Sequence, residues 1–167
     1  MSTLLVAPTR LPKDSITDPA QCLIYHLDNA PPEAVVFRNA DWACEIAPGF
    51  EVPGWYFLRA CRHALGWTEL GDHELAGFGP VARDLMFALE RVFDAPARCL
   101  MTFGEASPHF HCVVTVRTDD VPPESRSGNI LGLRASRVDR AAALALVPAV
   151  RDALPDQRRT PRSVVPD

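Results

Sequence analysis

The sequence predicts an α+β fold in which a five-stranded antiparallel sheet carries a long central helix and a C-terminal helix. Three observations predict it: five short apolar runs have the character of strands, one long segment repeats apolar residues every three or four positions, and the last two strands are joined by a hairpin-length link. The chain of 167 residues is long enough to bury one core. We expect a single domain over residues 19–154, with flexible arms at 1–18 and 155–167.

The elements follow from local patterns. Strands are expected at 34–38, 42–46, 55–58, 98–103 and 109–117, after a short helix at 20–27. The apolar spacing between Gly71 and Phe93 predicts the long helix, with Asp72 as its N-cap and a kink at Pro80. A run rich in Ala and Leu over 138–154 predicts the C-terminal helix.

Composition excludes several classes of partner. The formal net charge is -4 and the sequence pI about 5.7, so the electrostatic field of the protein would not attract the phosphate backbone of a nucleic acid. No apolar run approaches the roughly 20 residues that span a bilayer. The five cysteines are scattered without a C-x-x-C pair, which is typical of reduced thiols. We therefore expect a cytoplasmic protein that binds neither nucleic acid nor membrane.

The strand at 109–117 carries the residues most suited to chemistry. Because side chains alternate along a strand, His109, His111, Val113, Thr115 and Arg117 are expected on one face, and Phe110, Cys112, Val114 and Val116 on the core face. The two imidazoles would then stand about 6 to 7 Å apart on one accessible row.

Three interpretations of this pair remain open. Both histidines are ordinary, partly solvated strand residues, or they chelate a metal with Glu105 or His63 as a third ligand, although Thr115 stands where a carboxylate ligand is usual. In the third interpretation a neutral imidazole attacks phosphorus, with its second ring nitrogen held by an acceptor such as a backbone carbonyl. The turn from Gly104 to Ser107 would then supply donors to the phosphate.

Two segments resemble the histidine triad (HIT) family of nucleotide hydrolases and transferases. Residues 104–117 (GEASPHFHCVVTVR) resemble the family signature of three alternating histidines, and residues 52–63 (VPGWYFLRACRH) resemble its upstream segment of Pro-Gly-His, an apolar strand and a basic pair ending in His. The similarity covers roughly residues 22–117. It implies an antiparallel sheet with flanking helices, a homodimer with a continuous sheet, and a small nucleotide-like ligand.

The resemblance also implies roles for single residues. His111 corresponds to the nucleophile, His109 supports it, and Glu105, Ser107, Trp55, Val113 and Arg117 fall at or near substrate-binding positions. Val113 replaces the third histidine, Glu105 the phosphate-facing Gln, and Trp55 the histidine before the upstream strand. The ribose-binding carboxylate falls near Ala47, with Glu45 or Glu51 as possible substitutes. Cys22 has Tyr25 at its partner position, so neither structural zinc nor another cofactor is expected.

These observations favour a HIT-like phosphoryl or nucleotidyl hydrolase or transferase that acts through His111 on a small nucleotide phosphoester or phosphoramidate. The first alternative is a non-catalytic module of the same fold that binds a small molecule or a protein. The second is a metal-dependent enzyme that uses His109 and His111.

Overall fold

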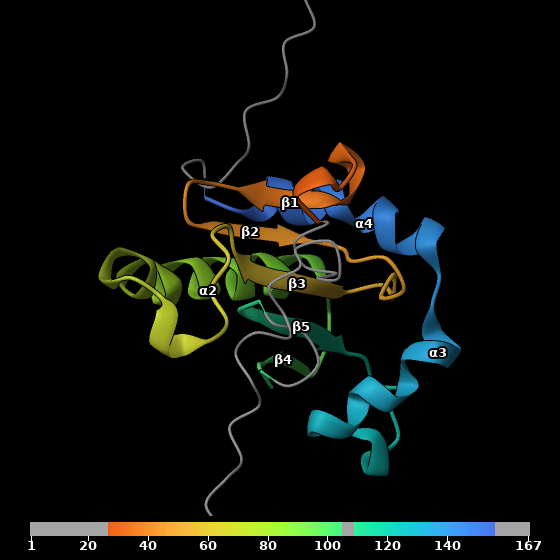
Figure 1. The fold of residues 1–167 in the computed structure, drawn as a ribbon. Helices are drawn as coiled ribbons and strands as arrows, with labels where there is room; N and C mark the ends of the chain where they lie inside the picture. The colour runs from red at the N-terminus through yellow and green to blue at the C-terminus, as the bar shows by residue number, and fades with distance from the viewer. Residues whose placement is uncertain (1–26, 105–108, 156–167) are drawn as a thin grey trace, which may run out of the picture.

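The computed structural model describes residues 27–104 and 109–155, and within them it has the expected α+β architecture. The five strands are β1 (Val35–Arg38), β2 (Trp42–Glu45), β3 (Trp55–Ala60), β4 (Ala97–Met101) and β5 (His111–Arg117). They form one antiparallel sheet in the order β1-β2-β3-β5-β4 (Figure 1). All five predicted strands are confirmed, with small differences at their ends. The predicted helix at 20–27 and the two arms lie almost entirely outside the described residues.

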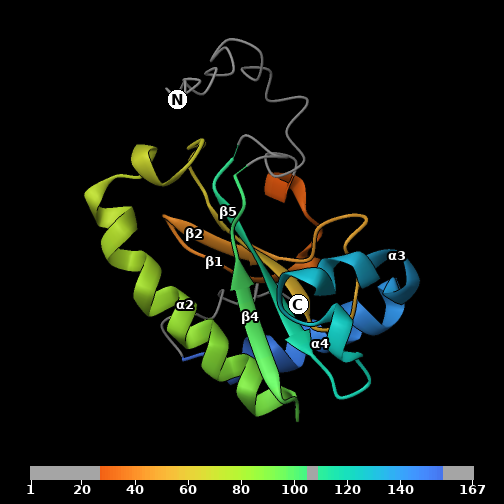
Figure 2. The same cartoon turned by 90° about the horizontal axis from the view of Figure 1, so that it is seen from below.

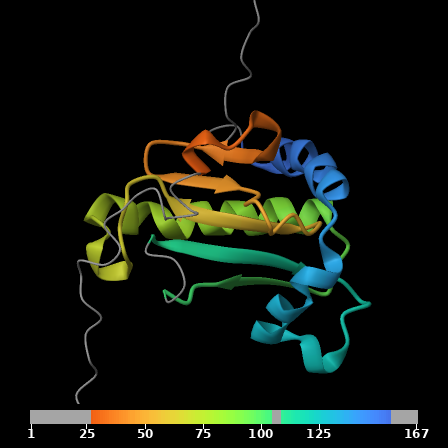
Figure 3. The same ribbon diagram turned by 45° about the vertical axis from the view of Figure 1, so that its right-hand side comes forward.

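The long helix α2 (Asp72–Val92) and the helix α4 (Arg140–Ala153) cover one face of the sheet, and Figure 3 shows α2 behind it. The core between them contains side chains from α2, α4 and the strands, among them Leu58, Val114, Leu85 and Val147. Alternation along β3 and β5 turns every second side chain toward this core. Both predicted helices are therefore confirmed.

The start of α2 differs from the expectation. Gly71 is the N-cap and Asp72 is the first helical residue, because the carboxylate of Glu74 reaches back and accepts the backbone N–H of Gly71 at 2.6 Å. The same carboxylate forms an ion pair with the guanidinium of Arg62 at 2.6 Å, so it links the preceding loop to the first turn of the helix. The helix continues through Pro80 without a break. At α4 the cap is Asp139, whose side chain accepts the N–H of Ala142.

Short helical segments that the sequence pattern did not predict cover the opposite face of the sheet. They are η3 (Leu27–Asn29), η7 (Ser127–Leu133) and the short helix α3 (Arg134–Arg137). Three more 3-10 segments lie elsewhere along the chain: η4 (Pro32–Ala34), η5 (Trp67–Glu69) and η6 (Pro123–Ser125). Leu27 joins one apolar cluster on this face, and Ile130 of η7 joins a second. This face is therefore partly closed by the chain itself.

The two edges of the sheet are treated differently. Helix α4 packs along β1, where Arg151 donates to the carbonyl oxygens of Pro32 and Val35. Strand β4 lies at the other edge, nearest the viewer in Figure 2, and within the described part of the chain no strand pairs with its outer side. An unpaired strand edge is able to pair with another chain.

Candidate active site

His111 is the first residue of β5, directly opposite Arg59 of β3. Its ring nitrogen Nδ1 lies 2.8 Å from the carbonyl oxygen of His109. A carbonyl oxygen only accepts hydrogen bonds, so Nδ1 carries the proton and Nε2 carries the lone pair in the neutral ring. Phe57 packs against the imidazole at a centroid distance of 5.2 Å. The ring is thus held in one tautomer by its own backbone and in one orientation by a neighbour.

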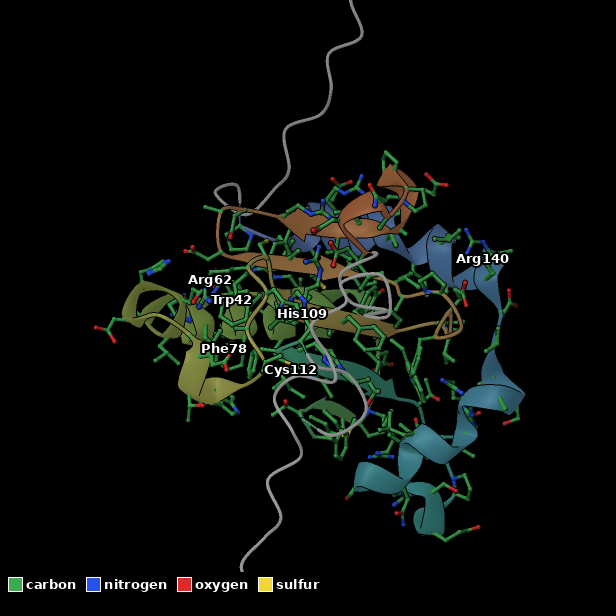
Figure 4. All side chains as sticks on the ribbon, in the orientation of Figure 1. Trp42, Arg62, Phe78, His109, Cys112 and Arg140 are labelled. Carbon is green, nitrogen blue, oxygen red and sulfur yellow. The ribbon has the colours of Figure 1, made fainter. Side chains whose placement is uncertain are left out.

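His109 does not stand beside His111 on an accessible row, and that expectation is wrong. His109, labelled in Figure 4, is only 2% exposed. Its Nε2–H donates to the carbonyl oxygen of Ala60 at 2.7 Å. The strand ladder begins at His111, so the alternation of side chains does not extend back to this residue. Its ring meets that of His63 edge to face at 5.2 Å. Its Nδ1 has no hydrogen-bond partner among the described residues.

Burial sets the protonation state of both rings. It lowers the pKa of His109 to about 4, against a smaller opposing effect of the Ala60 carbonyl, and the nearby positive charge of Arg59 lowers it further. Burial also lowers the pKa of His111, with the hydrogen bond to the His109 carbonyl as the opposing effect. Both imidazoles are therefore neutral at pH 7, which is the state a nitrogen nucleophile requires.

A small cavity of about 120 Å³ adjoins both histidines. Its other walls come from three places that are far apart in sequence: the loop before η5, the end of β4 and the start of β5. The lining residues are Leu65, Gly66, Trp67, Thr102, Phe103, Gly104 and Phe110. Trp67, the first residue of η5, and Phe103, just after β4, were not identified from the sequence, because they are more than thirty positions apart.

Val113 is the residue that the sequence resemblance sets at the position of the third histidine. It is buried in an apolar cluster with Leu27, Ala47 and Phe57, and Phe50 packs against that cluster. The Ala47 position, where the resemblance places the ribose-binding carboxylate, is thus part of the same closed cluster. No polar group is offered there by these side chains.

The two acidic residues considered as substitutes are both engaged in ion pairs. Glu45 is fully buried and accepts from Arg59 at 3.0 Å and from Arg38 at 2.6 Å. Glu51 pairs with Arg140 at 2.8 Å and accepts the N–H of Gly49. Their hydrogen-bonding capacity therefore serves the fold, and the substitution of either for a ribose-binding carboxylate is not supported.

The remaining site residues lie further away or outside the described residues. Trp55 is opposite Thr115 and packs with Val52, Val121 and Ile130, four positions along β3 from Arg59, or about 13 Å. Arg117 ends β5, six positions from His111, or about 20 Å. Glu105 and Ser107 lie in the stretch 105–108, outside the described residues.

The described residues give the metal interpretation no site. In this part of the chain no group of three or more His, Cys, Asp or Glu side chains is placed to hold a metal ion. Cys22 and Tyr25 lie outside it. The same part of the chain contains no helix long and apolar enough to cross a bilayer.

Comparison with known proteins places the fold. No protein family model matches the chain, and no curated protein matches it. A HIT-like protein involved in cell-cycle regulation from Bartonella henselae aligns with a TM-score of 0.63 at 16% identity, over 80% of this chain and 96% of that chain. A hypothetical histidine triad nucleotide-binding protein from Sulfolobus tokodaii aligns with a TM-score of 0.59 at 15% identity, over 77% and 87% of the two chains.

A third solved structure, a uridylyltransferase, aligns with a TM-score of 0.58 at 16% identity over 80% of this chain but only 45% of its own. Identities this low show the fold and nothing finer. The chain has the HIT-like fold, a five-stranded antiparallel sheet with flanking helices, as the resemblance implied.

Proposed function

We propose that this protein is a HIT-like phosphoryl or nucleotidyl hydrolase or transferase in which His111 is the nucleophile. The substrate class is a small nucleotide phosphoester or phosphoramidate. The uridylyltransferase and the histidine triad nucleotide-binding protein among the structural neighbours support a nucleotide-related role for the fold.

The hydrogen bond from His111 Nδ1–H to the His109 carbonyl oxygen, at 2.8 Å, is the observation that carries the proposal. It leaves Nε2 as the basic nitrogen, and the lowered pKa keeps that lone pair free at pH 7. The same ring lines a cavity, so a ligand is able to approach it.

The reaction would proceed in two displacements. His111 Nε2 attacks phosphorus, a P–N bond forms, and the bond from phosphorus to the leaving amine or alcohol breaks. The leaving group departs with a proton taken from solvent. Water or a second alcohol then attacks phosphorus, the P–N bond breaks, the proton of the attacking hydroxyl returns to solvent, and the neutral imidazole is released. For a phosphoramidate and water the net change is one phosphate monoester and one free amine.

The replacement of the third histidine by Val113 predicts a slow reaction with ordinary leaving groups. Loss of one oxyanion-type donor typically costs about 10²- to 10³-fold in rate. Glu105 and Ser107, which lie outside the described residues, remain the proposed phosphate-facing residues. Substrates with better leaving groups should therefore be turned over preferentially.

The direct test is to incubate the protein with adenosine 5'-phosphoramidate and follow both the intact mass of the protein and the release of AMP. We expect an adenylyl adduct on the parent protein and none on His111→Asn. His73→Asn, which alters an exposed imidazole on α2, is the matched control and should behave as the parent. AMP release by His111→Asn at the parent rate would reject the nucleophile assignment.

Binding without turnover is the second candidate function, and the buried, apolar Val113 favours it. Thermal stabilisation by nucleotides, together with no adduct and no product on any phosphoramidate or aryl ester, would support this alternative over catalysis.

A homodimer is also proposed, through the outer side of β4. Pairing of two such strands would extend the sheet across both protomers. The measurement that tests this proposal is the mass in solution by light scattering. A monomer at all concentrations would reject the dimer.

A further inference from the structure

The cavity beside His111 has the walls of a site for a flat, apolar group. Phe110 and Trp67 meet edge to face at 4.5 Å, and Phe78 supports the Trp67 ring from behind at 5.1 Å. Leu65 and Phe103 complete the apolar lining, and none of the described lining residues carries a formal charge when the histidines are neutral. Aromatic walls of this kind favour another ring in offset or edge-to-face contact.

Two of these rings are exposed at the mouth of the cavity. Trp67 is 45% exposed and Phe103 57%, although both are large apolar side chains. Trp67 is held by its contacts with Phe78 and Phe110 rather than turned into solvent. Exposed apolar side chains beside a reactive group are a common feature of ligand sites.

The opposite side of His111 is closed. Phe57 covers one face of its imidazole at 5.2 Å, and Val113, two positions further along the strand, is buried among Leu27, Ala47 and Phe57. A ring attached to a phosphate near Nε2 therefore finds no open pocket in that cluster. The cavity lined by Trp67 and Phe103 is an open volume that adjoins His111.

The size of the cavity limits what enters it. A volume of about 120 Å³ is close to that of an engineered cavity of about 150 Å³ that binds benzene. It therefore holds a single aromatic ring or one ring of a nucleobase, and the rest of a ligand must lie outside it, over His111.

We propose that this cavity binds a planar aromatic ring carried by the phosphoester, with Trp67 and Phe103 as the contacting side chains. The inference rests on the proposed function and adds the substrate class: phosphate compounds with an aromatic group close to phosphorus. That ring is either an aryl leaving group or a nucleobase, and both present the same chemistry to the cavity.

The test compares esters with and without the ring on the full-length protein by isothermal titration calorimetry. Phenyl phosphate is compared with methyl phosphate, and AMP with ribose 5-phosphate. Stacking on an aromatic side chain predicts a preference for the ring-bearing member of about 5- to 150-fold. A preference in the first pair identifies an aryl group, and one in the second identifies a nucleobase. Equal affinities in both pairs, or no measurable binding of either ring-bearing ester, would overturn the inference.

The location is tested by matched variants. Phe103→Ala should reduce the preference at least about five-fold, whereas Phe87→Ala, on α2 and 53% exposed, should leave it unchanged. Trp42 and Trp55 are buried, so acrylamide quenching of tryptophan fluorescence reports mainly on Trp67, and phenyl phosphate should protect it. A preference that survives intact in Phe103→Ala, with no protection of Trp67, would place the ring elsewhere and overturn the inference.

Turnover assays of the parent and of His111→Asn, run beside these titrations, separate this inference from the proposed function. If the parent shows a ring preference but no turnover, the catalytic proposal is rejected and the ring site is kept. If turnover depends on His111 but there is no ring preference, the ring site is rejected and the catalytic proposal is kept.

Discussion

Replacing His109 by Gln should remove the part of this protein's loss of stability at low pH that comes from the buried imidazole. In the folded state burial lowers the pKa of His109 to about 4, whereas in the unfolded chain an imidazole titrates near 6.5. Between these values the unfolded state binds a proton that the folded state does not, so the free energy of unfolding rises with pH. The contribution is complete above about pH 6.5 and is lost as the pH falls toward 4.

The magnitude follows from the shift. At about 1.4 kcal/mol per pKa unit, the change is worth about 3 kcal/mol at most. A Gln amide is able to donate to the Ala60 carbonyl as Nε2 does, but it does not titrate in this range. The free energy of unfolding of His109→Gln should therefore depend less on pH, and the carboxylates should account for the dependence that remains.

Urea denaturation of the parent and the variant at intervals from pH 4.5 to 7 measures this difference. The parent should lose about 2 to 2.5 kcal/mol more than His109→Gln over that range, which ends above the folded-state pKa of about 4. His73→Gln, at an exposed imidazole, should retain the slope of the parent. Identical slopes for the parent and His109→Gln would refute the assignment of His109 as a ring kept neutral by burial.

Three further predictions concern the frame of the site. Gly54→Ala should lower the free energy of unfolding by about 2 to 4 kcal/mol, because φ is 82° and the new Cβ would lie 3.0 Å from a β5 side chain. Gly49→Ala, with φ 79° and open space around it, should lower it by about 1 to 2 kcal/mol. Urea denaturation of the two variants measures the difference. Arg59→Met should cost about 3 to 5 kcal/mol by leaving the buried Glu45 short of a partner, and Glu45→Gln in the same chain should recover part of that loss. The rate of adduct formation should fall on acidification through a pKa below 6.5, because only neutral His111 attacks; a midpoint above 6.5 in the pH profile would contradict the burial of that ring.

The strands and the two main helices could be predicted from sequence because each has a local signal. Alternation marks β5, and spacing of three and four marks α2. The 3-10 segments over the second face carry no such periodicity, and η7 was missed for that reason. Local patterns thus describe the helix-covered layer well and the other face poorly.

The candidate site was predictable in part. His111 was identified by its motif, but the burial of His109 was not, because the alternation rule applies only within a paired strand and the ladder starts two residues later. Arg59 offered a usable signal: a single charge in an apolar strand indicates a buried ion pair. Its partner Glu45 is 14 positions away and stands alone in the same manner in β2, so the two could have been matched.

The closed and the open sides of His111 together restrict the chemistry that this chain is able to perform. Val113 and Phe57 belong to a buried apolar cluster, so these side chains give a substrate no polar contact. The adjoining cavity offers aromatic surface and no charge. Under the proposed function, binding energy and reactivity come from an aromatic group and from a good leaving group, which an activated aryl phosphoester combines in one part of the molecule. If the nucleophile is active, its rate should depend more on the leaving group than on the presence of a ribose.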